Sequence, residues 1–168
     1  LLVSRGLDEI LSFTLISEKE DASIRVFNKN EGFKIINPMT KDHEIVRSDL
    51  LPSLIATVDY NKAHQNKNLA LFEISPIDTP KGNHLYLSIA LCGEKMGRDE
   101  YMSRPYDFFD LKGYVYAVLR KIGLTDSRFR IAYSKNEKFH PNCSADIFVG
   151  KDLVGTFGQL HPSFYEDK

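Results

Sequence analysis

Hydrophobic positions recur at helical spacing in two segments of the chain. The first runs from Ser48 to about Lys62, with Pro52 in its first turn, where a missing amide hydrogen costs little. The second runs from Asp107 to Ile122 and is followed by Gly123, a residue typical of helix C-termini. The apolar stripe of the first segment consists of Leu50, Leu51, Leu54, Ile55 and Val58. This pattern predicts two substantial helices.

Shorter apolar patterns near the N-terminus predict strands and one small helix. The sequence LDEILSFTLI, from Leu7 to Ile16, combines alternation with β-forming residues and predicts one strand buried on at least one face. Ser17 and Glu20 have the Ser-x-x-Glu spacing of a capping box, which predicts a short helix. FKIINPM predicts a brief strand that stops at Asn37-Pro38, because proline cannot donate to a strand ladder.

The middle and the C-terminal third of the chain contain further strand patterns. NLALFEIS and HLYLSIALCG, which begin at Asn68 and His84, are joined by a segment rich in Pro and Gly and predict neighbouring antiparallel strands. RFRIAYS, CSADIFVG and LVGTFGQL predict three more short strands, the last two joined by a hairpin turn at Gly150-Lys151-Asp152. We therefore expect an α+β fold in which a mostly antiparallel sheet is flanked by the two helices.

The composition fits a folded globular protein. The chain has 168 residues, of which 42% are hydrophobic, and a chain of this length buries roughly 70% of its unfolded surface. We expect a single domain over residues 1–168. The opening LLVSRGL predicts that residues 1–6 are the tail of an upstream linking helix that closes on Gly6, in a piece of a longer protein. No apolar run reaches the roughly 20 residues of a membrane span, so we expect no membrane partner.

Charge, cysteine usage and motifs exclude several classes of function for this chain. The 22 basic and 23 acidic residues are well mixed, which disfavours nucleic-acid binding by a broad basic face. Cys92 and Cys143 lack CxxC spacing, which is typical of reduced thiols, and we expect a cytoplasmic protein. The 5 histidines are too scattered to pair as metal ligands. No P-loop, GxGxxG, GxSxG or HExxH motif occurs, so no cofactor or metal site is expected in this chain.

Three local features allow either a binding role or a structural one. His140 and His161 each precede a proline beside a predicted strand, so turn residues that hydrogen-bond nearby backbone are favoured over catalysts. Basic side chains between Arg120 and Lys138 could contact phosphate, but interleaved acidic residues favour a solvated face. The aromatic residues of YMSRPYDFFD could stack on a base, but an anchor in the core is favoured.

The order of several segments resembles the β subunit of bacterial-type phenylalanyl-tRNA synthetase. They are GLDEILSFTLIS, NPMTKDHEIVRSDLLPSLIATVDYNKAHQNKNLALFEI, DFFDLKGYVYAVLRKIGL and FHPNCSADIFVGKDLVGTFGQLHP. The resemblance runs from about Gly6 to Pro162 and falls on that subunit's class II aminoacyl-tRNA synthetase-like core domain, an antiparallel sheet flanked by helices. It implies an (αβ)2 ligase that joins phenylalanine to tRNA(Phe) with ATP and Mg2+, with its active site in the α subunit. The expected partners are the α subunit, a second β subunit and tRNA(Phe).

The resemblance also implies a role for the first predicted helix. NPMTKDHEIVRSDLLPSLIATVDYN would be the equivalent of the first class II motif, a strand and a long helix at a subunit interface. The residues that match the family pattern are Asn37, Pro38, Arg47, Leu50, Leu51 and Pro52. We therefore expect the stripe of Leu50, Leu51, Leu54, Ile55 and Val58 to contact a partner, with burial in the chain's own core as the alternative.

Glu73 matches the glutamate of the second class II motif, but the arginine of that motif is missing. In active enzymes this arginine, and another in a glycine-rich third motif, hold the charge of ATP and of the adenylate. Here Glu73 is soon followed by Ser75 and by the anionic Asp78, which would repel ATP. We expect no catalytic residue in this chain, and expect the vestigial Glu73 to bond backbone or a nearby cation.

The leading hypothesis is a non-catalytic structural and assembly domain. One alternative is a self-sufficient adenylate-forming ligase domain that uses Glu73 and residues near Arg104. The other is a tRNA-contacting binding module that uses the basic region with Arg128 and Arg130.

Overall fold

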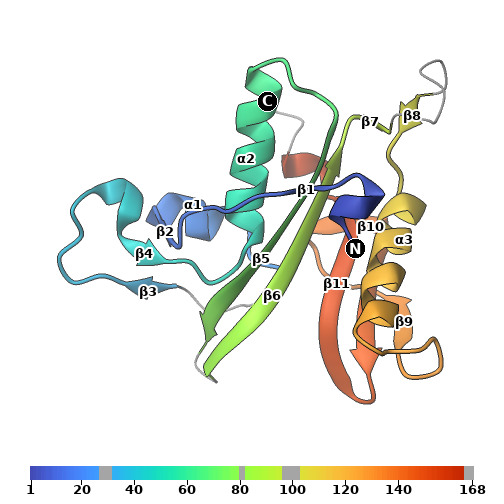
Figure 1. The fold of residues 1–168 in the computed structure, drawn as a ribbon. Coiled ribbons are helices and arrows are strands. Elements are labelled where there is room, and N and C mark those ends of the chain that lie inside the picture. The colour runs from blue at the N-terminus through green and yellow to red at the C-terminus, as the bar shows by residue number, and fades with distance from the viewer. Residues whose placement is uncertain (27–31, 80–81, 96–102, 165–168) are drawn as a thin grey trace. The chain divides into compact units, whose positions relative to one another are not determined.

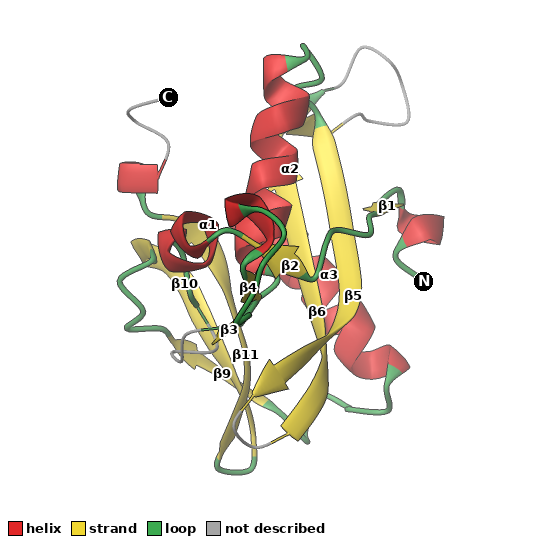
Figure 2. Cartoon of the chain, turned by 90° about the vertical axis from the view of Figure 1, so that its left-hand side faces the viewer, coloured by secondary structure: helices red, strands yellow, loops and turns green. Residues whose placement is uncertain are grey.

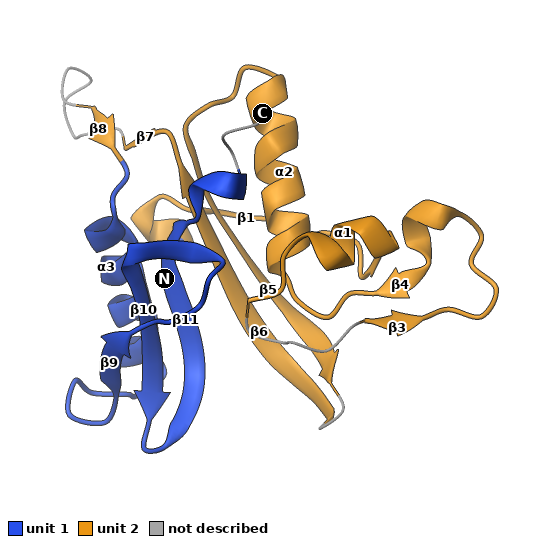
Figure 3. Cartoon of the chain, turned by 180° about the vertical axis from the view of Figure 1, so that it is seen from behind, with its two compact units in different colours: residues 1–2, 106–168 blue, residues 3–105 orange. Residues whose placement is uncertain are grey.

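The computed structural model describes residues 1–26, 32–79, 82–95 and 103–164 (Figure 1). The chain divides into two compact units, coloured separately in Figure 3. Unit 1 consists of Leu1–Leu2 and Tyr106–Lys168, and unit 2 of Val3–Pro105. The prediction of one domain over residues 1–168 stays a prediction.

A long β-hairpin and one helix form the centre of unit 2. Strands β5 (Leu69–Thr79) and β6 (Gly82–Cys92) pair antiparallel along their whole length, as the sequence predicts. Strand β1 (Asp8–Glu9) adds to the other edge of β5 in parallel. Helix α2 (Leu51–Ala63) packs on the hairpin (Figure 2). It begins slightly later than expected, with Pro52 in its first turn as predicted.

The hydrophobic contacts of α2 explain why it lies on this face of the hairpin. Leu54 is 0% exposed and packs with Leu69 and Leu71 of β5. Successive strand residues point to opposite faces, so alternate residues from Leu69 onward, including Glu73, share the face toward α2. We call this the α2 face of the hairpin, and the other side the outer face.

A small sheet projects from the centre of unit 2 (Figure 1). It consists of β2 (Leu15–Ile16), β4 (Ile45–Val46) and β3 (Phe33–Lys34), in the order β2-β4-β3. Helix α1 (Glu18–Ser23) follows β2, and the Ser17 side chain accepts a hydrogen bond from the Glu20 backbone N–H, as the capping pattern predicts. A 3-10 turn, Lys41–His43, precedes β4. Strands β7 (Glu94–Lys95) and β8 (Arg104–Pro105) pair separately.

The prediction of one strand from Leu7 to Ile16 is wrong. The segment contains β1 and β2, which belong to two different sheets. The chain leaves β5 after Ile10, whose backbone N–H bonds the Phe72 carbonyl, and then crosses to β4. The strand expected over FKIINPM is also shorter than predicted, since only β3 pairs. A 3-10 turn, Val3–Arg5, closes at Gly6, which has a φ of 86°.

Unit 1 is built from one helix and an antiparallel sheet. Helix α3 (Phe108–Lys121) begins with a capping box between Asp107 and Asp110. Strands β9 (Arg130–Tyr133), β10 (Phe139–Val149) and β11 (Asp152–Leu160) form the sheet in the order β11-β10-β9. A 3-10 turn, Pro162–Phe164, follows β11. The helix and the presence of three strands match the sequence prediction, but β10 begins at Phe139 instead of Cys143. The hairpin turn is also shorter than predicted, because Asp152 already pairs with Val149 as the first residue of β11. Gly150 in this turn has a φ of 62°. The core consists of Leu119, Phe129, Ala145, Ile147 and Phe157.

The α+β class is confirmed, but the hydrogen bonds do not join the described strands into one antiparallel sheet. They define separate sheets, and β1 runs parallel to β5. Among the described residues, no helix has the length and apolar character to cross a membrane.

Candidate functional site

A buried ion pair joins the segment between β4 and α2 to strand β5 of the hairpin. Arg47 Nη2 lies 2.7 Å from Glu73 Oε1, and both side chains are 0% exposed. Arg47 comes directly after β4, and Glu73 lies in the middle of β5 on the α2 face. A buried charge is costly unless it is paired and hydrogen-bonded, so the local structure depends on this contact.

Ser12 donates further hydrogen bonds to the Glu73 carboxylate. The Ser12 hydroxyl donates to Glu73 Oε2 at 2.7 Å, and the Ser12 backbone N–H donates to Oε1 at 3.3 Å. Arg47 Nη1 in turn donates to the Ser12 hydroxyl. Glu73 therefore bonds backbone and a nearby cation, which confirms the prediction made for it. Both carboxylate oxygens are occupied within the chain, so neither is open to a substrate.

Asp21 is the centre of a second buried cluster. One carboxylate oxygen, Oδ1, accepts from the Ser48 backbone N–H at 3.1 Å and from the Ser48 hydroxyl at 2.9 Å. The other, Oδ2, accepts from Arg25 Nη2 at 2.7 Å and from the Gly32 backbone N–H at 3.3 Å. Burial opposes ionisation, but the hydrogen bonds from Ser48, Arg25 and Gly32 outweigh it and hold the pKa of Asp21 below its usual value.

Asp49 makes a third connection of the same kind. It accepts from the Val26 backbone N–H at 3.0 Å and from the Leu51 backbone N–H at 3.1 Å, at the start of α2. Asp21, Asp49 and Glu73 thus bind the segments around the small sheet to α2 and β5. Because every oxygen of these three carboxylates accepts a hydrogen bond from the chain itself, their arrangement fixes structure rather than offering a reactive group.

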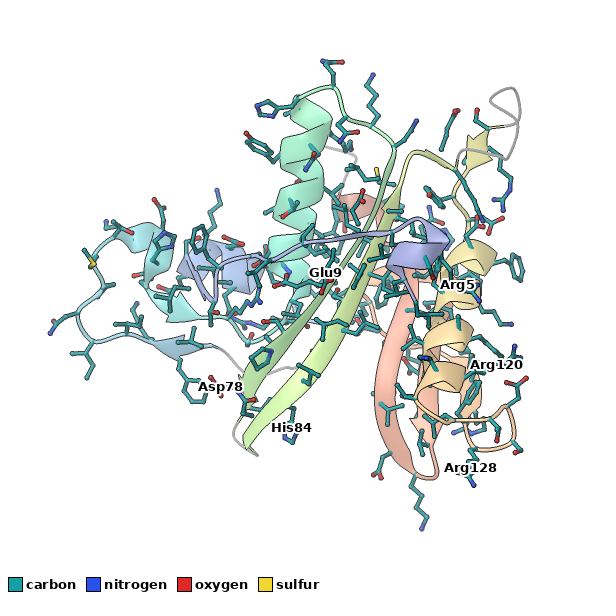
Figure 4. All side chains as sticks on the ribbon, viewed as in Figure 1. Arg5, Glu9, Asp78, His84, Arg120 and Arg128 are labelled. Carbon is teal, nitrogen blue, oxygen red and sulfur yellow. The ribbon has the colours of Figure 1, made fainter. Side chains whose placement is uncertain are left out.

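The outer face of the hairpin carries no cation among its described residues. Its exposed members include Ile74, Leu85 and Leu87, and Ile74 pairs directly with Leu87. The charged residue on this face is Asp78, which accepts from Asn83 at 2.8 Å. Figure 4 shows Asp78 and His84 at the tip of the hairpin. Glu73 and Asp78 lie on opposite faces, so they do not form one site.

The predicted interface stripe on α2 is largely buried within unit 2. Leu50 and Leu54 are 1% and 0% exposed, which agrees with the core alternative for these two residues. Leu51, Ile55 and Val58 are half-buried, and Val58 packs against the Leu54 cluster. A partner contact by this stripe stays a prediction, and the half-buried members are those that could make it.

A set of large apolar side chains is exposed around the small sheet, which the sequence pattern did not predict. Ile36 and Met39 are 94% and 99% exposed. The full set is Leu11, Phe13, Phe33, Ile36 and Met39, which we call the apolar arm. Their strand-like pattern suggested burial on one face. The signal that could have revealed them is the placement of Ile36 and Met39 on either side of Asn37-Pro38, where a strand cannot continue.

Both histidines bond nearby backbone, as predicted, but His140 lies within strand β10 rather than in a turn, whereas His161 follows β11. His140 Nδ1 accepts from the Asn142 backbone N–H at 3.2 Å, and His161 Nδ1 accepts from the Ser163 backbone N–H at 3.3 Å. Within the described ranges, no cluster of three His, Cys, Asp or Glu side chains could hold a metal ion.

The basic region of unit 1 makes several contacts within the chain. Arg120 pairs with Asp126 at 2.7 Å, and the Arg130 guanidinium lies 4.5 Å from the centre of the Phe148 ring. Figure 4 shows Arg120 and Arg128 on this unit. Of the predicted aromatic cluster, Phe108 stacks on Phe157 in the core. Tyr101 lies outside the described residues.

Comparisons with known proteins give one consistent family. A family model described as "Phenylalanyl tRNA synthetase beta chain CLM domain" matches residues 1–167. The chain is 34% identical over 166 residues to the phenylalanine–tRNA ligase beta subunit of Rickettsia typhi, covering 96% of this chain and 20% of that protein. The corresponding protein of Bacillus subtilis is 29% identical over 175 residues, with 99% and 21% covered. The chain thus spans about a fifth of the length of these relatives.

Solved structures agree on the fold. Pyrrolysyl-tRNA synthetase from Desulfitobacterium hafniense matches with a TM-score of 0.64 at 13% identity, covering 92% of this chain and 53% of that chain. A second structure of that organism's enzyme, PylSc, matches with a TM-score of 0.62. At this identity the likeness concerns the fold alone.

Proposed function

Because the chain belongs to the phenylalanyl tRNA synthetase beta chain CLM domain family, we propose that it is a non-catalytic structural and assembly domain of a phenylalanine–tRNA ligase β subunit. The complete enzyme would attach phenylalanine to tRNA(Phe) with ATP and Mg2+ in the cytoplasm. It would be an (αβ)2 assembly, in which this domain contacts the α subunit or the second β subunit.

The apolar arm is the observation that carries the proposal. Monomeric proteins rarely expose large contiguous apolar patches, and such patches mark interaction sites. Ile36 and Met39 contribute almost nothing to the folded chain's own core, since they are 94% and 99% exposed. Each would contribute about 1.5–3 kcal/mol if fully buried against a partner.

The buried carboxylates support the same function. Asp21, Asp49 and Glu73 hold the segments from which the arm projects, so its apolar side chains are presented on a fixed base. A preformed surface loses less conformational entropy on binding than a flexible one. We propose that this is the reason for burying so many charges in a small unit.

The hairpin contacts argue against catalysis by this chain. Adenylate formation needs cations that hold phosphate charge. On the α2 face Arg47 is neutralised by Glu73 at 2.7 Å, and on the outer face the described residues include the anionic Asp78 but no cation. We expect the purified chain to show no ATP–pyrophosphate exchange, and exchange to return with the α subunit. Exchange by the chain alone would overturn the non-catalytic role.

The assembly role is tested with the double variant Ile36→Asp, Met39→Asp in the complete β subunit, co-expressed with the α subunit. Both side chains are exposed, so the fold should persist while co-purification is lost. Leu85→Asp is the matched control, because Leu85 is an exposed leucine on the outer face of the hairpin. Normal complex formation by the folded double variant would refute the assembly role of the arm.

A further inference from the structure

The acidic residues interleaved in the basic segment of unit 1 do not balance all of its positive charge. The basic residues of this segment are Arg120, Lys121, Arg128, Arg130, Lys135 and Lys138. Its acidic residues are Asp126 and Glu137. Arg120 bonds both carboxylate oxygens of Asp126, at 3.0 and 2.7 Å. The acidic residue nearest to Arg128 in the sequence is therefore already neutralised by another arginine.

Arg130 lies over an aromatic ring that restrains its side chain. Arg130 of β9 pairs with Phe148 of β10, and the guanidinium carbon lies 4.5 Å from the centre of the ring. A stacked guanidinium keeps its N–H groups at the edge of its plane, where they bind anions. Arginine recognises phosphate in this way, through two parallel hydrogen bonds. Because the ring restrains Arg130 before an anion arrives, less conformational entropy is lost on binding.

Arg128 is exposed on the same side of the chain as Arg130. Phe129, which separates them, belongs to the core of the unit, whereas both arginines are exposed. A hydrogen bond of 2.8 Å from the Arg128 backbone N–H to the Thr125 carbonyl closes the turn before β9. Because two residues span at most about 7 Å, the two arginines form one compact pair of cations.

An RNA backbone is the partner whose chemistry matches this pair of cations. Its phosphates recur at short intervals along the strand, and guanidinium planes also stack on unpaired bases. A protein partner fits less well, because the centre of a protein interface is depleted of charge, whereas the centre here is two arginines. Asp146, on the same face of the sheet as Phe148, is engaged by Thr156 at 2.9 Å. The net charge of -1 disfavours a broad basic face, so the contact is a local one.

We infer that Arg128 and Arg130 bind neighbouring phosphates of an RNA strand, and that Phe148 positions Arg130 for this contact. We call these three residues the basic edge. Phosphate contacts carry no direct sequence information, so the basic edge binds RNA without regard to its bases. The choice of tRNA as this RNA rests on the proposed function, whereas the contact itself shares no residue with the apolar arm.

The first test removes both cations in the assembled enzyme. Arg128→Ala with Arg130→Ala is made in the complete β subunit. Fluorescence anisotropy then follows the binding of labelled tRNA(Phe), and of a tRNA for another amino acid, from about 50 to 200 mM salt. The slope of log K against log salt concentration should become shallower by about 1 for each arginine removed, equally for both RNAs. Lys62→Ala with Lys67→Ala removes the same charge from exposed positions of unit 2 and should leave the slope unchanged.

The outcomes of this test separate the inference from the proposed function. RNA binding is measured on enzyme that has assembled, so a failure of the apolar arm to bind a partner does not alter the result. An unchanged slope in the arginine variant would overturn the inference. Normal RNA binding together with weakened subunit association would assign the basic edge to a protein partner, and would overturn it as well. A change confined to one of the two RNAs would contradict recognition of the backbone.

The second test removes the ring and keeps the charge. Phe148→Leu should weaken RNA binding by about threefold, because Arg130 loses its cation–π contact, and should leave the salt slope unchanged. In the Arg130→Ala background the same change should have no effect on RNA binding. Tyr133→Leu is the control, because it removes a 59% exposed ring from the opposite face of β9. An equal loss of affinity with and without Arg130 would overturn the positioning role of Phe148.

Discussion

Two regions of unit 2 reverse the usual distribution of polar and apolar residues. In the buried clusters Asp21, Arg47 and Glu73 are charged and enclosed, whereas in the apolar arm Ile36 and Met39 are almost fully exposed. Ionisable residues are rarely fully buried unless they are paired. The contrast indicates two separate roles: the internal charges fix the base of the small sheet, and the external apolar side chains are left for a partner.

The largest expected effect comes from removing the cation of the buried pair. Arg47→Met leaves Glu73 buried with its negative charge uncompensated. The free energy of unfolding should fall by about 3–5 kcal/mol. Urea denaturation followed by circular dichroism measures this change.

A double variant separates the effect of the uncompensated charge on stability from the effect of altered packing. Arg47→Met combined with Glu73→Leu should recover most of the lost stability, because no uncompensated charge remains. Lys34→Met is the control, since Lys34 pairs with Glu18 on the surface and the change should leave stability unaltered. If Arg47→Met lowered the free energy of unfolding no more than Lys34→Met, the buried clusters would not be what stabilises unit 2.

Leu54→Ala compares the core and interface interpretations of the α2 stripe. Leu54 is 0% exposed, so truncation should create a cavity and reduce the free energy of unfolding by about 2–5 kcal/mol. Thermal and urea unfolding of the free β subunit give this value. A variant of normal stability that no longer binds the α subunit would instead place Leu54 at the interface.

Asp21→Asn should have a smaller and pH-dependent effect. Loss of the charged acceptor for Ser48, Arg25 and Gly32 should reduce the free energy of unfolding by about 1–3 kcal/mol at neutral pH. Because the pKa of Asp21 is lowered in the folded chain, its contribution is complete above the usual value of 3.8 and is lost as the pH falls through the lower folded-state pKa. The difference between the two proteins should therefore shrink on acidification below pH 3.8. A difference that grew on acidification would contradict this assignment.

Local patterns were sufficient to predict the elements of unit 1 and the central hairpin. Helix α3 has its cap at Asp107 and its closing Gly123 in the sequence itself, and each strand of the β5–β6 hairpin carries its own pattern. The bonds of Glu73 to backbone and to a cation were also expected, because the resemblance identifies it as the glutamate of a second class II motif that has lost its arginine.

The partners themselves could not be predicted from local patterns. Arg47 and Glu73 are separated by 26 residues, and Ser12 and Glu73 by 61 residues. Such contacts form only when the small sheet, α2 and β5 come together in the folded unit. No local spacing of residues in the sequence therefore predicts them. The break between β1 and β2 was missed for a similar reason, since competing strands β5 and β4 divide one apolar pattern between two sheets.

Amide hydrogen exchange of the β subunit, with and without the α subunit, tests the central account most directly. Binding over the apolar arm should slow exchange in the peptide covering residues 33–46, while β10 and β11, within residues 139–160, serve as the internal reference. Slower exchange in residues 33–46 of the complex, with the reference unchanged, is the predicted result. Equal exchange of residues 33–46 in the free subunit and in the complex would contradict it.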